Sequence, residues 1–480
     1  MATINSAGIG SGLDVNSIVT QLMAIERQPL NALQSRQTSI QSTVSEYGKV
    51  KSAVSTLRDL AVKLAGSSAW AQTVSTTSNS DAVTATTNGS APFNYRIEVL
   101  ALAGAQTLAS SVFASTEATP GAGTMHIELG RWGAGQTSFT PKAGAGAVDI
   151  SVAATDTLGN VRDKINAAGA GVTALIMTDA GGSRLLLRSN STGAESAFRS
   201  TVTDADGSNA NASGLSALAF DPSAGAAVMA QTQAAANASA TINGLAVSSP
   251  TNTLANVVDG LTLNFSALTT AAVNVDVVPD KDALKKTLTE FADAYSAISK
   301  LIATDTKYDP VSKRGGILQG DGAVTALQRE LRNLVSATSG ASTVFGHLSD
   351  AGLQLQGDGS MTVNAGKLDS ALANLTELKK AFSNSNVLDA TKDGFAKRFR
   401  VATDTMLAGD GSLTTRTDGL GQQLQRNQKD QDTLTLRLAG IEKRMRAQYT
   451  ALDTTMARLN GTSSYVTQMI AANNASNSSR

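Results

Sequence analysis

The side chains that most often carry catalysis or bind metals are scarce in this 480-residue chain. It has no cysteine and only two histidines, His126 and His347. Thiolate chemistry is therefore excluded. One histidine falls among predicted strands and the other beside a predicted turn, whereas a shared metal site or a catalytic triad needs groups that converge. We expect no catalytic residue, no bound metal and no cofactor, and hence no enzyme.

Glycine- and aspartate-rich motifs are the remaining places where chemistry could reside. Residues 8–12 read Gly-Ile-Gly-Ser-Gly, but no predicted strand precedes them, so we interpret them as the flexible entry to a helix. Residues 204–209 resemble a calcium loop, but Leu215 stands where the bidentate glutamate belongs. Three Gly-Asp-Gly repeats also occur, at residues 320–322, 357–359 and 409–411. Each is interpreted as a turn beside a helix.

The charge balance excludes two classes of partner. Lys+Arg and Asp+Glu both number 39, so the formal net charge is zero and no field of one sign attracts nucleic acid or an anionic membrane. No run of about 18 apolar residues is present, so we expect no insertion into a membrane. The N-terminus lacks the basic and apolar segments of a secretory signal peptide. An exported chain would therefore leave the cell by another route.

Proline placement separates helical ends from a loop- and strand-rich middle. Apart from Pro29, every proline lies between Pro92 and Pro310, and proline interrupts helices. Towards the C-terminus, a heptad seam recurs with alternating spacings of four and three, as in a coiled coil. Its members are Leu420, Leu424, Asn427, Gln431, Leu434, Leu438, Ile441, Met445, Gln448, Leu452, Thr455 and Leu459. The polar members weaken such a seam and help to fix its register.

The N-terminal end has a similar pattern. Asp14 is placed to cap a short amphipathic helix over residues 15–25, and Pro29 interrupts or kinks the helical run. A second helix is predicted over residues 33–64, ending at Gly66. At the other end, apolar residues between Tyr465 and Ile470 extend the seam face, and we expect the Asn/Ser-rich tail from Asn473 to be disordered.

The middle reads as β structure because apolar and polar residues alternate. Strands are predicted within residues 81–87, 95–99, 147–153, 171–177, 184–188, 240–242, 245–247, 261–265 and 273–277. Asn243-Gly244 is a strong hairpin turn, residues 158–165 form one short helix, and residues 204–236 are expected to be a mobile loop. Helices return at residues 284–302, 324–335, 368–382 and 388–406.

These patterns predict a multidomain α+β protein in which terminal helices form a coiled-coil or helical bundle, with β-rich domains inserted between them. We expect four domains. They are a terminal leg (1–42 with 425–480), a helical bundle (43–72 with 281–424), a β domain (73–110 with 235–280) and an outer β-rich domain (111–234) with one short helix.

Several motifs resemble one known family. The run from Gly8 to Asp14, followed by Ile18–Met23 and Glu26–Leu30, resembles the start of the bacterial flagellar cap family, flagellar hook-associated protein 2. Residues 240–263 and 318–332 look like further signatures of that family. Residues 157–190 are similar to a module of flagellin-type proteins that contains an Ile-Asn dipeptide, here Ile165-Asn166.

The resemblance implies a structural protein at the distal tip of the flagellar filament, outside the cell, that guides flagellin into place. It implies partners as well: flagellin at the filament tip, other copies of the chain in a ring, commonly a pentamer, and a type III export chaperone near the C-terminus. Under this hypothesis, partner contacts are expected from the apolar terminal residues Leu13, Ile18, Val19, Leu22, Met23, Leu434, Leu438, Ile441, Met445, Leu452 and Leu459.

Two alternatives stay open on the residues alone. A secreted adhesin could use the Ser/Thr/Asn-rich middle to bind a host glycan or mucin, and adhesion could also coexist with capping. Another axial flagellar protein, such as one at the hook–filament junction, would share the terminal helices, although the Gly-Ser-Gly-Leu-Asp motif at residues 10–14 argues against it.

Overall fold

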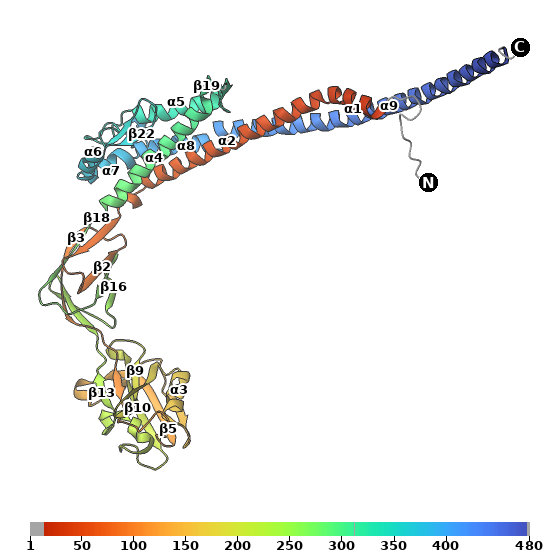
Figure 1. Cartoon of the computed structure of the whole chain (residues 1–480). Helices are drawn as coiled ribbons and strands as arrows, with labels where there is room; N and C mark the ends of the chain where they lie inside the picture. The colour runs from red at the N-terminus through yellow and green to blue at the C-terminus, as the bar shows by residue number, and fades with distance from the viewer. Residues whose placement is uncertain (1–13, 312, 478–480) are drawn as a thin grey trace. The chain divides into compact units, whose positions relative to one another are not determined.

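A computed structural model describes residues 14–311 and 313–477 of the chain. It divides into two compact units (Figure 1): a helical unit built from both ends of the chain, Met1–Trp70 with Asp282–Arg480, and a β unit, Ala71–Lys281. The predicted contact residue Leu13 and the glycine-rich residues 8–12 lie outside the described residues. The predicted class, terminal helices around a β-rich middle, is confirmed.

The helical unit is built around three helices from opposite ends of the chain. Helix α2 contacts both α8 and α9, and α1 contacts α9 (Figure 1). The helices of this unit are α1 (Val15–Glu26), α2 (Gln28–Ala65), α4 (Lys281–Thr306), α5 (Gly322–Ser336), α6 (Ala365–Leu372), α7 (Leu375–Ser383), α8 (Phe395–Leu407) and α9 (Ser412–Asn477). Two small hairpins join them: β19 (Tyr308–Asp309) with β20 (Arg314–Gly315), and β21 (Leu353–Leu355) with β22 (Met361–Val363).

The predicted cap of α1 and the predicted end of α2 are confirmed, whereas α2 begins at Gln28, five residues before the predicted start. The Asp14 carboxylate accepts a hydrogen bond from the Ser17 backbone N–H at 2.9 Å and so caps α1. Pro29 lies in the first turn of α2, where its missing N–H breaks no helical hydrogen bond. Gly66 ends α2 in an extended conformation. One interruption therefore separates two helices rather than kinking a single one.

Four predictions for the helical unit are wrong. Residues 368–382 form two helices, because Asn374 caps a new one with its side chain. Residues 388–394 precede α8 as a loop and a short 3-10 turn. The repeat at residues 357–359 joins the strands of a hairpin instead of flanking a helix. Helix α9 continues to Asn477, so the tail from Asn473 is helical as far as the structure describes it.

One large apolar core holds the helical bundle together. It draws on α2, α4, α5 and α8, with Tyr47, Phe291 and Phe399 fully buried. The rings of Phe291 and Phe399 meet edge to face with centroids 5.1 Å apart. On α9 the core reaches Leu420 and, partly buried, Leu424. The first part of α9 therefore belongs to the bundle, and the rest must find other contacts.

The β unit begins with two antiparallel sheets that share one core. Its strands are β1 (Thr73–Thr77), β2 (Val83–Thr87), β3 (Phe93–Ala101), β14 (Ala238–Ile242), β15 (Leu245–Ser249), β16 (Thr253–Val258), β17 (Leu261–Phe265) and β18 (Val273–Pro279). One sheet has the order β1-β18-β3-β14-β15 and the other β16-β17-β2. The predicted hairpin at Asn243-Gly244 is confirmed, and both residues have positive φ (51° and 80°), as a type I′ turn requires.

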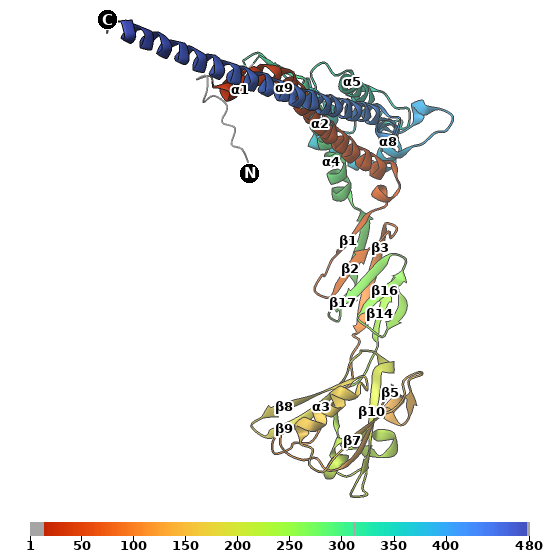
Figure 2. The same cartoon turned by 90° about the vertical axis from the view of Figure 1, so that its right-hand side faces the viewer.

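The remainder of the β unit holds a second core between two further sheets and helix α3 (Leu158–Ala168), which contacts β8 (Figure 2). Its strands are β4 (Thr107–Ala109), β5 (Gly123–Trp132), β6 (Phe139–Pro141), β7 (Val148–Val152), β8 (Val172–Asp179), β9 (Gly182–Ser189), β10 (Ala197–Asp204), β11 (Phe220–Asp221), β12 (Ala226–Ala227) and β13 (Ala230–Gln233). One sheet runs β12-β11-β10-β5-β6 with β7 beside β5, and the other runs β13-β4-β9-β8.

The prediction that residues 204–236 form a mobile loop is wrong. They contain strands β11, β12 and β13, and they bury Leu215, Leu218 and Phe220 in the second core. Asp204 organises the segment by accepting a hydrogen bond from the Ser216 backbone N–H at 2.9 Å. The segment is mostly polar in composition, which led to the prediction of a loop. Its few apolar residues bury enough surface to order it.

The division into four domains stays a prediction. The described residues do form four separate apolar clusters, two in each unit. The predicted boundaries at residues 42 and 424 fall inside the continuous helices α2 and α9. Each of these helices therefore passes from one apolar cluster to the next without any break in the backbone.

Candidate partner-binding helices

The terminal helices α1 and α9 pack together through an apolar cluster, here called the α1–α9 cluster. Val15, Val19 and Met23 recur every four residues along one face of α1 and are buried against Leu438 of α9. Around them lie the partly buried side chains Leu30, Leu434, Ile441, Met445 and Tyr449. Two polar contacts flank the cluster: Arg446 donates to the Asn16 side chain at 3.0 Å, and Arg27 pairs with Glu442 at 3.5 Å.

The structure brings most of the predicted contact residues together inside the chain. Six of them meet in the α1–α9 cluster: Val19, Met23, Leu434, Leu438, Ile441 and Met445. Ile18 and Leu22 are half-buried on α1, whereas Leu452 and Leu459 are exposed on α9. Tyr449 belongs to the cluster but was not predicted, although it follows Met445 by four residues and so shares its face. Contact of these residues with another protein stays a prediction.

Beyond the α1–α9 cluster, the apolar face of α9 continues without a covering helix in the described part of the chain. Leu438, Met445, Leu452, Leu459 and Val466 follow one another at intervals of seven residues and therefore share one side of the helix. The first two are covered by α1, but Leu452, Leu459 and Val466 are 45%, 59% and 47% exposed. Tyr465, Met469 and Ile470 widen this exposed face. We call Leu452–Ile470 the open face of α9.

A cluster of amide side chains lies between the bundle core and the α1–α9 cluster. Gln431 donates to Gln37 of α2 at 3.0 Å and to Asn427 at 2.6 Å, and Gln37 donates to Gln428 at 3.0 Å. The Asn427 side chain is almost fully buried, yet its Nδ2 has no hydrogen-bond partner. Gln431 and Gln428 therefore link α9 to Gln37 of α2, and Asn427 supports Gln431 from within α9. Paired polar groups at a helix seam favour one register.

A second polar contact joins three helices of the bundle. Asp321 caps α5 and accepts hydrogen bonds from the Tyr47 hydroxyl at 2.5 Å and from Arg416 Nε of α9 at 2.9 Å. Burial favours the neutral acid, but the hydrogen bonds from Tyr47 and Arg416 outweigh burial and lower the pKa of Asp321. Burial, together with the nearby carboxylate, raises the pKa of Tyr47. The contact fixes the start of α9 against the bundle.

The described residues do not bring the histidines or acidic side chains together into a recognisable catalytic or metal-binding group. His126 contacts Asp149 at 2.5 Å and His347 lies 3.6 Å from Asp350, and the two histidines lie in different units. No group of three or more metal-ligating side chains is found among the described residues. The described helices also include none with the length and apolarity needed to span a lipid bilayer.

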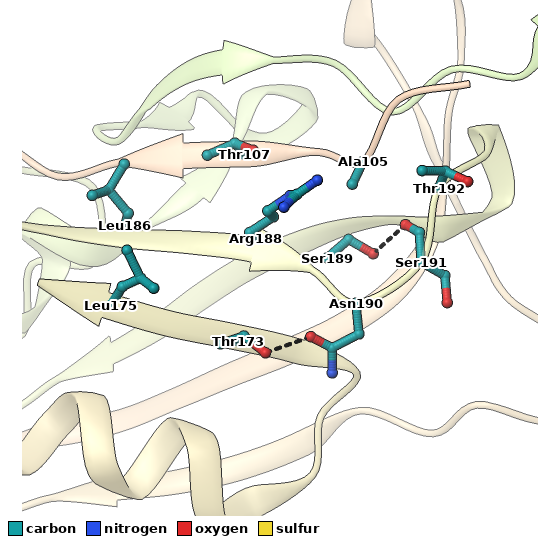
Figure 3. A pocket seen from close by; sticks show the side chains of 10 residues that line it. All are labelled: Ala105, Thr107, Thr173, Leu175, Leu186, Arg188, Ser189, Asn190, Ser191 and Thr192. Atoms are coloured by element: carbon teal, nitrogen blue, oxygen red, sulfur yellow. Dashed lines mark hydrogen bonds between the residues drawn. The ribbon is translucent and has the colours of Figure 1, made fainter. Parts of the chain in front are cut away.

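A hollow in the β unit could accept a small ligand. It has a volume of about 580 Å³ and lies over β4, β8 and β9. Figure 3 shows Arg188 between Thr107 and Thr173, with Leu175 and Leu186 towards one end. The Thr173 hydroxyl donates to Asn190 at 2.5 Å. Polar groups of this kind can orient a ligand, but the glycan partner stays a prediction.

Family models match three parts of the chain. Residues 11–106 match the N-terminus of flagellar hook-associated protein 2, and residues 235–461 match the C-terminus of the same protein. Residues 134–191 match the flagellin hook IN motif. This last match covers α3 and the β8–β9 pair, in agreement with the resemblance carried by Ile165-Asn166.

Comparison with individual proteins points to the same family. The chain is 31% identical to flagellar hook-associated protein 2 of Escherichia coli K12, covering 98% of this chain and 99% of that protein. It is 29% identical to the A-type flagellar hook-associated protein 2 of Pseudomonas aeruginosa, over 98% and 97% of the two chains. Its structure is similar to that of the flagellar cap protein FliD from E. coli, with a TM-score of 0.57 and 26% identity. The similarity covers 78% of this chain and 99% of that one. The chain therefore belongs to the flagellar hook-associated protein 2 family.

Proposed function

We propose that this chain is the capping protein at the distal end of the bacterial flagellar filament, outside the cell, where it promotes the folding and polymerisation of flagellin. The observation that carries the proposal is the open face of α9. Helix α1 covers the heptad face of α9 as far as Met445, and the face is exposed from Leu452 onwards. An exposed heptad face of this kind needs a helical partner. The helices of filament subunits at the growing tip supply that partner.

The open face suits a contact that forms and breaks repeatedly. Full burial of one leucine or valine contributes about 1.5–3 kcal/mol, and the open face offers only a few such residues. Each leg of the cap is therefore held weakly, while several legs together hold firmly. Weak individual contacts allow the cap to move as each new subunit enters beneath it.

The assignment as a filament cap also leads us to propose two further partners, other copies of the chain and an export chaperone. Several copies of the chain form a ring, with five as the expected number. A chaperone covers the C-terminal part of α9 before export through the flagellar type III channel, because exposed apolar side chains favour aggregation in the cytosol. The relatives are described as hook-associated and cap proteins, which supports a structural rather than a catalytic role.

Deleting the gene and restoring variants tests the proposal. The deletion strain should release unassembled flagellin into the medium and carry few or no filaments. The full chain should restore filaments, whereas a chain that lacks residues 461–480 should not. This truncation leaves all four apolar clusters intact, so near-native thermal unfolding of the purified variant provides the control. Normal filaments with lost surface binding would overturn capping and favour the adhesin.

A further inference from the structure

The outer edge of strand β8 is apolar and uncharged. The sheet β13-β4-β9-β8 ends at β8, and no further strand pairs with it in the described part of the chain. Residues 172–178 read Val-Thr-Ala-Leu-Ile-Met-Thr, without a charge or a proline. Leu175 and Met177 are 53% and 50% exposed on the outer face. A segment of this composition on an exposed edge is typical of sites where strands of separate chains pair and aggregate.

Alternate residues of β8 direct both backbone polar groups away from β9. In an antiparallel pair, successive residues bond in turn to the partner strand and to the outer side. The Asn190 backbone N–H donates to the Gly171 carbonyl at 3.0 Å, which continues the register of the β8–β9 pair. Odd-numbered residues of β8 therefore bond to β9. Ala174, Ile176 and Thr178 present their N–H and C=O groups at the edge.

The side chain of Asn166 occupies this edge at Ala174. Its Nδ2 donates to the Ala174 carbonyl at 2.9 Å, and its Oδ1 accepts from the Ala174 backbone N–H at 2.7 Å. A residue of an antiparallel strand would exchange the same two hydrogen bonds with Ala174. A strand that approaches β8 therefore meets a bound amide in place of free backbone groups.

The neighbouring Ile165 explains how the amide is held at the edge. Ile165 is fully buried in the second core and so fixes α3 against the sheet. Helix α3 contacts β8 (Figure 2). Successive helical residues point about 100° apart, so Asn166 turns away from the core while Ile165 faces it. In the Ile-Asn dipeptide, the isoleucine anchors the helix and the asparagine pairs with the strand.

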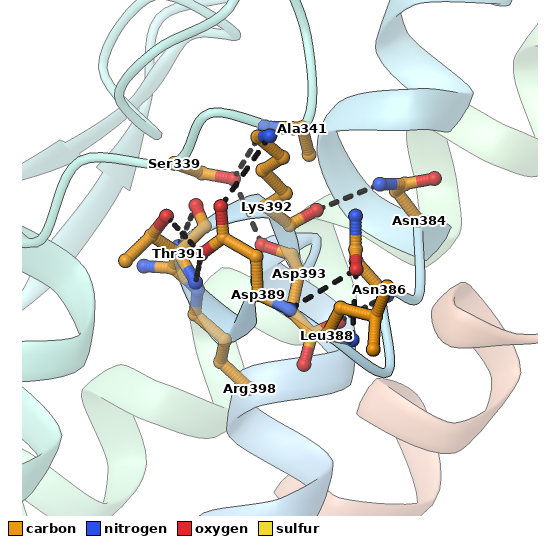
Figure 4. A network of polar contacts seen from close by, with 10 residues as sticks. All are labelled: Ser339, Ala341, Asn384, Asn386, Leu388, Asp389, Thr391, Lys392, Asp393 and Arg398. Carbon is orange, nitrogen blue, oxygen red and sulfur yellow. Dashed lines mark hydrogen bonds and ion pairs between the residues drawn. The ribbon is translucent and has the colours of Figure 1, made fainter.

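Side-chain amides also replace backbone partners elsewhere in the chain. In the loop before α8, Asn386 accepts from the Leu388 backbone N–H at 3.0 Å (Figure 4). The fully buried Gln106 pairs with both backbone groups of Phe198, donating at 2.8 Å and accepting at 3.0 Å. Asn166 makes the same two-way pairing with the last strand of a sheet. Its amide therefore stands where a strand of another chain would bind.

We propose that Asn166 blocks strand addition at the β8 edge and so keeps residues 172–178 of separate copies from pairing with one another. The excluded partner is the same segment of a second copy. Two identical edges can align antiparallel, and each then offers its free backbone groups and its apolar face to the other. The block lies within the β unit and is independent of the α9 contacts on which the proposed function rests.

Sedimentation velocity of the purified full chain tests the block. Asn166→Ala loses both bonds to Ala174, so the fraction of protein in assemblies larger than those of the native chain should rise at least about tenfold. The matched control is Asn160→Ala, at another exposed position of α3 whose side chain lies near Asp156. Both changes alter helix propensity equally. If the two variants sediment alike, Asn166 does not block the edge.

A second substitution shows whether the association uses the β8 edge. Met177 is half exposed on this strand, and a lysine on an edge strand opposes pairing through its charge. Asn166→Ala/Met177→Lys should therefore return to the native distribution, whereas Met177→Lys alone should change nothing. Assemblies that persist in the double variant would overturn the proposal, because they would arise from general loosening of the fold and not from strand pairing.

Asn166→Asp keeps the proposal testable if Asn166→Ala does not fold. Its carboxylate still accepts from the Ala174 N–H, and its charge repels another strand, so it should sediment like the native chain. Hydrogen–deuterium exchange at low protein concentration gives a direct readout of the pairing. The Ala174 amide should exchange at least about tenfold faster in Asn166→Ala and keep its protection in Asn166→Asp. Association of the aspartate variant, or unchanged exchange in the alanine variant, would contradict the block.

Discussion

The hydroxyl group of Tyr47, on α2, donates a 2.5 Å hydrogen bond to Asp321, a residue 274 positions later in the chain. Asp321 also accepts a hydrogen bond from Arg416, so one carboxylate joins α2, the start of α5 and the start of α9. The surrounding core is otherwise mainly apolar. This contact holds the start of the last helix against the bundle.

Removing the shared carboxylate should destabilise the helical unit strongly. Asp321→Ala leaves the Tyr47 hydroxyl and the Arg416 guanidinium without their partner and removes the cap of α5. We expect a loss of about 2–3 kcal/mol in the free energy of unfolding, from the lost cap and the unpaired Tyr47 hydroxyl, since Arg416 is partly exposed and can be solvated. Tyr47→Phe removes a single hydrogen bond and should cost about 1 kcal/mol. Urea denaturation measures both variants, and equal losses would contradict the central role of Asp321.

Acid should weaken the contact between α7 (Leu375–Ser383) and the loop after α5. Glu377 accepts hydrogen bonds from Lys380 at 2.7 Å and Ser342 at 2.7 Å, which lower the pKa of Glu377 from 4.5 to about 2. Because the folded pKa lies below the unfolded one, the stabilisation is complete above the unfolded value and is lost as pH falls through the window from 4.5 to about 2.

The matched variant Glu377→Gln cannot titrate. Its unfolding midpoint should therefore fall less steeply than that of the native chain between about pH 5 and about pH 3. Denaturant melts at several pH values give the comparison. Parallel curves for the two proteins would show that Glu377 does not cause the acid sensitivity of this region.

Replacing the buried amide that lacks a partner should stabilise the pairing of α2 with α9. Asn427→Leu removes the unsatisfied Nδ2 group, although it also removes the oxygen that accepts from Gln431, while Gln431 keeps its bond to Gln37. Because the buried leucine side chain offsets that lost bond, we expect a net gain of about 1 kcal/mol. Gln431→Leu instead breaks the bonds to both Gln37 and Asn427, so it should give no gain. Chemical denaturation measures the stability of both variants. Equal changes in stability would show that the register of α9 on α2 does not depend on these amides.

The open face of α9 can be separated from the buried part of the same seam. Leu459→Ser with Val466→Ser should leave stability unchanged, because both residues are exposed, yet it should abolish capping. Leu438→Ala, in the α1–α9 cluster, should cost about 2–5 kcal/mol. Filament counts and flagellin in the medium measure capping.

The matched control for the open face is Leu436→Ser. Leu436 is also exposed on α9, but it lies two residues before Leu438 and therefore on another side of the helix. It should change neither stability nor capping. If the Leu459→Ser/Val466→Ser strain keeps its filaments, the open face is not the docking surface.

Much of the secondary structure could be predicted because it depends on local chemistry. The heptad spacing identified α9, alternation identified strands such as β7 and β17, and Asn243-Gly244 marked its hairpin because that turn requires positive φ. Strands β5 and β10 were missed, although they lie at the centre of their sheet. Their stability comes from pairing with distant strands, which no local pattern reports.

For the candidate site, the sequence by itself determined which side of α9 is apolar, because a seven-residue repeat follows from helix geometry alone. Only the tertiary structure decided where that side is covered. Met445 is packed against α1, whereas Leu452 is exposed, although the two are equivalent in the repeat. The difference arises because α1 begins at Val15 and has a limited length, so its reach along α9 depends on how the two helices pack. Periodicity shows that a helix has an apolar face, and packing decides how much of that face remains for a partner.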